Sequence, residues 1–148
     1  MQLKHITIFC DGGSRGNPGP AAAGVVIVNE VGETLTRFGT NLGIATNNSA
    51  EYQAVISAFG WLQKNMPHVK TITFKLDSLL VVKQLMGEYR VKDSALKLLY
   101  TQVKDLEKKL SANFHYVHIS RADNRQADRM VNQTLDTRLA GVGTLPSE

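Results

Sequence analysis

The chain has 148 residues, of which 43% are hydrophobic and 20% are charged, the composition of an ordinary globular domain. No run approaches the roughly 18–20 apolar residues of a membrane span. The N-terminal "MQLKHITIF" predicts a strand instead of a secretory leader. A single cysteine excludes an internal disulfide framework. We therefore expect one cytoplasmic domain that has no membrane contact and no obligate protein partner, and that is a monomer.

The positive charge is concentrated in one part of the chain. The formal net charge is +4, and residues 90–129 account for all of it, with nine Lys or Arg against five Asp or Glu. The remaining residues balance, with eight basic and eight acidic side chains. Such a stretch suits a polyanionic partner, and it equally suits a solvated helix face, so charge alone leaves both interpretations open.

The spacing of the hydrophobic residues predicts nine helices and strands. The predicted strands span residues 3–10, 22–29, 34–40, 71–77 and 114–120, and the predicted helices span residues 47–65, 78–86, 93–111 and about 124–139. This order predicts an α/β fold with a five-stranded mixed sheet, three strands antiparallel and two parallel, and helices on both faces. We expect one domain over residues 1–140 and a flexible tail over residues 141–148.

Four acidic residues fall where such a fold gathers functional side chains. Asp11 and Asp77 end the first and fourth predicted strands. Glu51 lies near the start of the first predicted helix, and Asp128 lies in the first turn of the last one. Any one of them alone is typical of a turn or a helix cap. Four carboxylates at one sheet edge would repel each other without a cation, and oxygen ligands suit Mg²⁺ or Mn²⁺. Two such ions promote in-line displacement at a phosphodiester, so the acids together predict a metal-dependent enzyme.

The first predicted strand runs into a glycine-rich segment, "FCDGGSRGNPGP". The segment is not a nucleotide-binding P-loop, because no GK[ST] follows it and no GxGxxG opens a helix here. We expect its small residues to leave space for a nucleic-acid backbone. Ser14 and Asn17 would supply short polar groups for minor-groove edges and 2′-hydroxyls. A plain polar turn is the alternative.

The chain resembles the type 1 ribonuclease H family in four blocks: "DGGSRGNPGPAAAG", "TNNSAEYQAV", "LDS" and "NRQAD". The blocks occur in the family's order, and the resemblance covers about residues 5–136. It implies the ribonuclease H-like fold and hydrolysis of the RNA strand of RNA/DNA hybrids by two-metal-ion in-line attack. The products would carry 5′-phosphate and 3′-hydroxyl ends. Two Mg²⁺ ions, for which Mn²⁺ would substitute, would be held by the four matching catalytic acids: Asp11, Glu51, Asp77 and Asp128.

The resemblance also implies contacts with the RNA/DNA hybrid. The positions that match minor-groove and 2′-hydroxyl contacts are Ser14, Asn17, Asn47 and Asn48. Thr46, together with Asn17, falls where the family holds a phosphate of the DNA strand.

The chain departs from many family members in two places. Their loop histidine is missing, because the corresponding segment reads "SRADNRQAD", and Arg121 is our candidate for a substrate-facing residue there. Their basic protrusion is reduced to "GEYRVKDSALK", which leaves Tyr89, Arg90 and Lys92 as the remnant of a DNA-strand channel. Both departures resemble the compact branch of the family that lacks the protrusion.

Three functions fit these observations to different degrees. The leading hypothesis is a hybrid-specific endoribonuclease. The second is a non-catalytic hybrid-binding module of the same fold, which the complete set of four acids disfavours. The third is another nuclease of the wider superfamily, such as a junction resolvase or a transposase-like enzyme. Those proteins share carboxylates at strand ends but lack the "GNPG" and "TNN" blocks.

Overall fold

The computed structural model describes residues 4–140, so the tail predicted over residues 141–148 lies outside the described residues. The strands are β1 (His5–Ser14), β2 (Gly19–Val28), β3 (Thr34–Ala45), β4 (Thr71–Leu76) and β5 (Asn113–His118). The helices are α1 (Asn47–Asn65), α2 (Leu79–Leu85), α3 (Ser94–Lys109), the 3₁₀ turn η1 (Arg121–Asn124) and α4 (Arg125–Ala140). None of the described helices is both long enough and apolar enough to cross a membrane.

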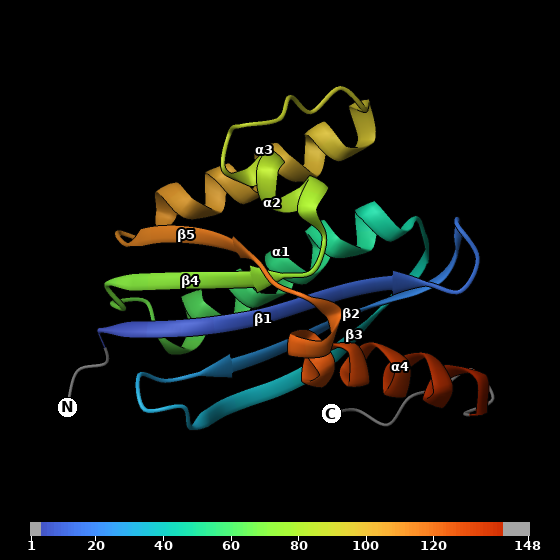
Figure 1. Cartoon of the computed structure of the whole chain (residues 1–148), viewed down its shortest axis with the longest axis horizontal. Helices are drawn as coiled ribbons and strands as arrows, with labels where there is room; N and C mark the ends of the chain where they lie inside the picture. The colour runs from blue at the N-terminus through green and yellow to red at the C-terminus, as the bar shows by residue number, and fades with distance from the viewer. Residues whose placement is uncertain (1–3, 141–148) are drawn as a thin grey trace.

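A five-stranded sheet in the order β3-β2-β1-β4-β5 forms the centre of the molecule (Figure 1). β2 pairs antiparallel with β1 and with β3, whereas β4 runs parallel to both β1 and β5. Parallel neighbours need a crossover connection, and α2 and α3 provide it between β4 and β5. The mixed sheet predicted from the order of elements is confirmed.

Helices cover both faces of the sheet, and each face has its own apolar core. α1 packs against β1 and β2 with α3 beside it, whereas α4 packs across β1, β2 and β3 in front of the sheet in Figure 1. The larger core lies on the α1 side and contains Phe59 and Phe74, whose ring centroids are 5.2 Å apart. The smaller core lies under α4. Residues 21–27 of β2 are therefore buried throughout, because helices cover both sides of this strand.

The first three strands extend further than the hydrophobic pattern predicted. β1 continues to Ser14 and β2 begins at Gly19, which leaves only residues 15–18 as the connecting turn. We predicted that Asp11 ends its strand. In the structure it lies inside β1 instead. Pairing with β4 stops after Cys10, whereas pairing with β2 continues to Ser14. Asp, Gly and Ser are disfavoured in strands, so only the pairing with β2 reveals the extension.

The helix starts are set by side-chain caps, two of which lie close to predicted site residues. The Thr46 hydroxyl accepts a hydrogen bond from the Ser49 backbone N–H and caps α1. Ser78, which directly follows Asp77, caps α2 in the same way by accepting from the Val81 N–H. Each cap satisfies a backbone donor that the helix itself leaves free, and so fixes where the helix begins.

Gly24 allows α4 to pack closely on the sheet. A Cβ added at Gly24 would lie 2.2 Å from the carbonyl oxygen of Ala127, far inside van der Waals contact. Gly24 pairs with Asp11 across the β1–β2 ladder, and Ala127 directly precedes Asp128. This glycine therefore sets the distance between the strand that carries one predicted acid and the helix that carries another.

Replacing Gly24 by Ala tests this close approach. The added methyl group has to push α4 outward, so we expect Gly24→Ala to lower the free energy of unfolding by about 1–3 kcal/mol, measured by urea denaturation. Gly60→Ala is the matched control. It lies in α1 with nothing within 4 Å of an added Cβ, and alanine favours a helix over glycine by roughly 0.5–1 kcal/mol. Equal losses in the two variants would contradict the prediction.

Candidate active site

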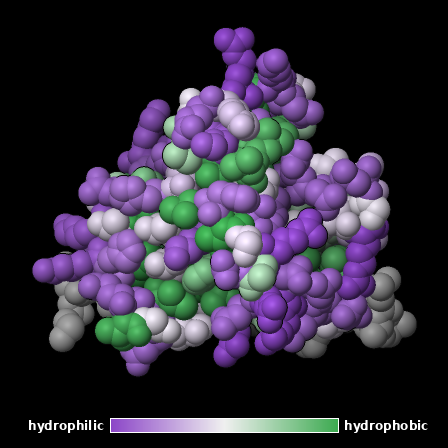
Figure 2. Space-filling view, in the orientation of Figure 1, coloured by the Kyte–Doolittle hydropathy of each residue, from purple (hydrophilic) through white to green (hydrophobic). Residues whose placement is uncertain are grey.

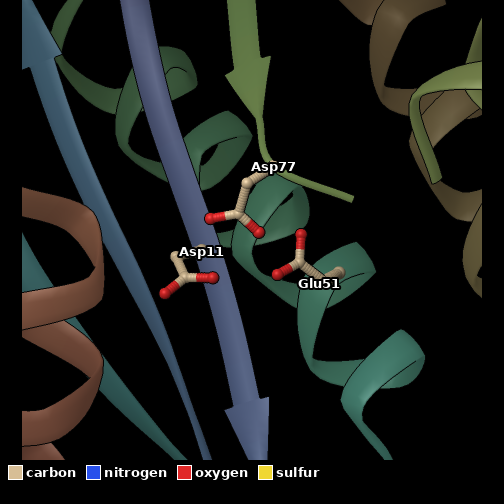
Figure 3. A group of neighbouring side chains, drawn as sticks. All are labelled: Asp11, Glu51 and Asp77. Atoms are coloured by element: carbon tan, nitrogen blue, oxygen red, sulfur yellow. The ribbon is translucent and has the colours of Figure 1, made fainter. Parts of the chain in front are cut away.

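Three of the predicted acids converge at the end of the parallel strands. Asp11, Glu51 and Asp77 each offer a carboxylate oxygen, and these oxygens lie within 4.8 Å of one another. Figure 3 shows the three side chains pointing toward one another from β1, α1 and the segment after β4. Asp11 and Glu51 are 40 positions apart in the chain, and Glu51 and Asp77 are 26 positions apart. The fold thus brings three distant acids into one cluster.

The register of β1 against β4 places two of these acids side by side. Cys10 pairs with Leu76 as the last pair of the parallel ladder. Asp11 and Asp77 are the residues that directly follow this pair. Because the strands run in the same direction, the two acids lie at the same edge of the sheet.

Glu51 reaches the cluster because α1 approaches β1 closely at Gly12. A Cβ at Gly12 would lie 2.1 Å from the Ala50 carbonyl carbon, so only glycine leaves room for the helix. The Gly12 backbone N–H donates a hydrogen bond of 2.9 Å to Glu51 Oε1. The other oxygen, Oε2, is buried and has no hydrogen-bond partner within residues 4–140.

Burial raises the pKa of both Asp11 and Glu51. Asp11 is 7% exposed and Glu51 is 5% exposed. Burial, reinforced by the negative charge of Asp77, raises the pKa of Asp11 to about 7. Burial and the adjacent Asp11 raise the pKa of Glu51 well above its ordinary value.

The donor atoms fit a hard divalent cation. Among residues 4–140 the cluster combines three carboxylates with no histidine or cysteine, and Mg²⁺ and Mn²⁺ prefer oxygen ligands. A buried carboxylate oxygen without a hydrogen bond, such as Glu51 Oε2, is unfavourable unless a proton or a cation compensates it. A divalent ion between the carboxylates would remove both the repulsion and this deficit.

The acids line a cavity of about 450 Å³. Asp128, from the first turn of α4, is exposed and lines the same cavity, although it stands outside the group of three. Asp11 and Asp128 both line this cavity, and the negative charge of Asp128 contributes to the raised pKa of Asp11. The structure thus gathers three predicted acids in one cluster and places the fourth at its rim.

Four of the predicted substrate-contacting residues line this cavity: Ser14, Asn47, Asn48 and Arg121. Thr46 and Asn17 do not. Thr46 caps α1, and Asn17 Oδ1 accepts a hydrogen bond of 2.9 Å from the Asn47 backbone N–H. In this structure both residues fix the start of α1, while their predicted phosphate contact stays a prediction.

The other three predicted contacts, Tyr89, Arg90 and Lys92, are exposed in the segment that joins α2 to α3, outside the cavity. The Tyr89 backbone N–H bonds to the Lys83 carbonyl, which anchors this segment on α2. The surface over α2 is one of the more apolar areas of a largely hydrophilic face (Figure 2), and Leu79 and Met86 are exposed there. Contact with a DNA strand at this segment stays a prediction.

Two glycines of the glycine-rich segment, Gly12 and Gly19, allow close packing within the protein itself. The space at Gly12 is filled by α1, and a Cβ at Gly19 would lie 2.3 Å from the Arg15 carbonyl oxygen. On the side where a Cβ would lie, these two glycines therefore face the protein's own backbone, while the approach of a nucleic-acid backbone to the segment stays a prediction. Both glycines allow the protein's own backbone segments to pack against each other.

Sequence reasoning missed several polar residues of the site, among them Asn124, Arg15 and Asn132. Asn124 is buried next to Asp77, and the other two line the cavity. Asn132 follows Asp128 by four residues, so helical spacing alone could have placed it on the same face. Asn124 precedes Asp128 by four residues and offered the same signal.

Comparison with known proteins agrees with this geometry. A family described as reverse transcriptase-like matches residues 9–134. The crystal structure of LC11-RNase H1 in complex with an RNA/DNA hybrid superposes with a TM-score of 0.88 at 40% sequence identity, covering 90% of this chain and 99% of that one. The chain belongs to the type 1 ribonuclease H family. Ribonuclease H1 from Halobacterium salinarum superposes with a TM-score of 0.84 at 36% identity, covering 89% of this chain and 98% of that one.

Two curated relatives are longer than the chain. The ribonuclease HI of Halobacterium salinarum is 37% identical in an alignment of 138 residues that covers 89% of this chain and 65% of that protein. A bifunctional protein of Mycobacterium tuberculosis is 37% identical over 132 residues, which are 88% of this chain and 35% of that protein. The chain thus spans less than two thirds of either curated relative.

The raised pKa of Asp11 predicts how the stability of the chain depends on pH when no divalent cation is bound. A folded-state pKa of about 7 against an ordinary 3.8 stabilises the fold below pH 4, and this stabilisation is lost as pH rises through 7. In chelator at pH 8, we expect Asp11→Asn to raise the free energy of unfolding by about 2 kcal/mol. At pH 4, where the native carboxyl is protonated, we expect no gain.

Urea denaturation at both pH values checks this prediction. Asp105→Asn in α3, where the side chain is exposed, is the matched control and should change little at either pH. A gain for Asp11→Asn that is equal at pH 4 and pH 8 would show that electrostatic repulsion at the site is not its cause.

Proposed function

We propose that this chain is a metal-dependent endoribonuclease that hydrolyses the RNA strand of RNA/DNA hybrids. The observation that carries the proposal is the convergence of Asp11, Glu51 and Asp77 at the wall of an open cavity, with one buried Glu51 oxygen that has no hydrogen-bond partner among the described residues. Membership of the type 1 ribonuclease H family supports it, as does the hybrid in the crystal structure of LC11-RNase H1.

Four acids of this chain would hold two Mg²⁺ ions, for which Mn²⁺ would substitute: Asp11, Glu51, Asp77 and Asp128. Such ions, when bound, supply a more acidic water and stabilise charge on the leaving oxygen of an in-line displacement. The products would carry 5′-phosphate and 3′-hydroxyl ends. The chain's own part is to hold the carboxylates in place, and the Gly12 N–H does this for Glu51.

The polar residues at the cavity wall would recognise the hybrid. Ser14, Asn47 and Asn48 are small donors and acceptors beside the acids, suited to 2′-hydroxyls and minor-groove edges. Their positions are interlocked, because the Ser14 backbone N–H donates 2.9 Å to Asn47 Oδ1. Arg121, on the 3₁₀ turn before α4, adds a positive charge that would attract a phosphate.

A cleavage assay on one end-labelled RNA strand tests the proposal. The strand is offered alone, paired with RNA and paired with DNA, each with Mg²⁺, with Mn²⁺ and with chelator. We expect metal-dependent cutting of the DNA-paired strand. Asp77→Asn keeps the side-chain shape but removes a carboxylate oxygen, so we expect it to reduce kcat about 100-fold or more. Asp105→Asn should leave kcat unchanged.

Two outcomes would overturn the catalytic proposal. Full activity in Asp77→Asn would show that the Asp77 carboxylate is not needed for cleavage. Binding of the hybrid without any cutting by the unaltered protein would favour the non-catalytic binding module instead.

A further inference from the structure

Asn124 joins the chain segments that carry three of the four acids. Its side-chain Nδ2 donates a hydrogen bond of 2.8 Å to the Cys10 carbonyl and one of 3.0 Å to Asp77 Oδ2. Cys10 directly precedes Asp11, and Asn124 lies one helical turn before Asp128. One amide therefore contacts β1, the segment after β4, and the start of α4.

The chemistry of this position requires a donor of two hydrogen bonds. Both partners, a backbone carbonyl and a carboxylate, accept hydrogen bonds, so only the NH₂ side of the amide satisfies them. An aspartate of the same shape would set a third negative charge against Asp77. Asn124 is 1% exposed, and within residues 4–140 its Oδ1 has no hydrogen-bond partner. A buried amide that keeps one oxygen unpaired while making these two bonds is poorly explained as mere packing.

We propose that Asn124 is a positioning residue of the metal site. It holds the Asp77 carboxylate in one orientation and sets the distance of the α4 start from β1, and thereby the separation of Asp128 from Asp11. The inference rests on the proposed function, and it concerns metal binding, which can be measured without cleavage. Residues that orient metal ligands in this way typically contribute 10–100-fold to metal affinity or activity.

Calorimetric titration of Asn124→Ala with Mn²⁺ and with Mg²⁺ tests the proposal. We expect metal affinity to fall about 10–100-fold and kcat on the hybrid to fall by a similar factor, while KM for the hybrid changes less than about threefold. Asn124→Ser, which keeps one donor, should show a smaller loss in both quantities. This variant carries the test if the alanine variant does not fold.

Tyr116→Phe is the matched control, because it removes one hydrogen bond of a buried side chain, to Glu107 on α3, outside the cavity. Metal affinity in Asn124→Ala and Asn124→Ser within twofold of the unaltered protein would overturn the proposal, as would an equal loss in Tyr116→Phe. If the unaltered protein cuts no hybrid but Asn124→Ala still weakens metal binding, the proposed function fails and the positioning role stands.

A separate observation concerns Arg15, in the turn between β1 and β2. Its side chain lines the cavity, and its Nη2 donates 2.7 Å to Asp136 Oδ1 and 3.4 Å to Asn132 Oδ1, both on α4. The turn holds the backbone of Arg15 firmly, because its N–H bonds to the Pro20 carbonyl. Asp136 lies eight residues beyond Asp128, about 12 Å along the helix axis.

The ion pair of Arg15 is easily exchanged for another partner. The Arg15 side chain is 37% exposed and that of Asp136 is 69% exposed, so the pair is worth little in water. A backbone phosphate can accept two parallel hydrogen bonds from a guanidinium, whereas Asp136 offers Arg15 a single carboxylate oxygen. Arg15 and Arg121 are the two arginines that line the acidic cavity, the second next to the start of α4.

We infer that Arg15 binds a backbone phosphate of the hybrid, and that Asp136 holds the guanidinium in place until substrate arrives. This inference also rests on the proposed function. It predicts opposite behaviour for the two members of one ion pair. Removing Arg15 takes away a phosphate contact, whereas neutralising Asp136 frees the same arginine for the phosphate.

Fluorescence anisotropy with a labelled RNA/DNA hybrid, in chelator to prevent cutting, tests this inference at several salt concentrations. We expect Arg15→Ala to weaken binding about 5–10-fold and to reduce the slope of log K against log salt by about one. We expect Asp136→Asn to bind as tightly as the unaltered protein or up to about threefold more tightly. Equal weakening in both variants, or a change under twofold in Arg15→Ala, would overturn it. Failure of the unaltered protein to bind or cut any hybrid would overturn the proposed function as well.

Discussion

Burying Asp11 and Glu51 beside each other is unfavourable, because both carboxylates lose hydration and repel one another. Neither side chain could hold this position alone. Each is fixed by its backbone, Asp11 on β1 near the middle of the sheet and Glu51 on a helix that packs into the larger core. The Gly12 N–H compensates one Glu51 oxygen and leaves the other without a partner. The fold thus holds two carboxylates in an electrostatically unfavourable arrangement, which a divalent cation between them would stabilise.

The parallel pairing of β1 with β4 turns this deficit into a defined geometry. Cys10 and Leu76 form the last pair, so the residues that follow, Asp11 and Asp77, meet at the same level of the sheet. A shift of one residue in this register would turn one of the two side chains to the opposite face. The buried, alternating residues of both strands oppose such a shift, because it would expose the larger core.

The fourth acid reaches the site from the other layer of the molecule. Asp128 is carried by α4, which rests on the smaller core formed by Ala22, Val131 and Leu135. Two further contacts bring the helix to the correct place, the close approach at Gly24 and the hydrogen bonds of Asn124. The position of Asp128 therefore depends on how α4 packs, whereas the other three acids are fixed by the sheet and α1.

Local patterns in the sequence determined the number, type and order of the main elements, because alternation and helical spacing are properties of short segments. They also determined which acids to examine. Two features were decided only by tertiary structure. β1 continues through Asp11 because it pairs with β2 there. The hydrogen bond from Asn124 to the Cys10 carbonyl joins residues that are 114 positions apart in the chain. The same holds for Gly12. The residues around Gly12 do not tell whether a ligand or the protein itself fills the space beside this glycine. The packing of α1 against β1 shows that the protein fills it.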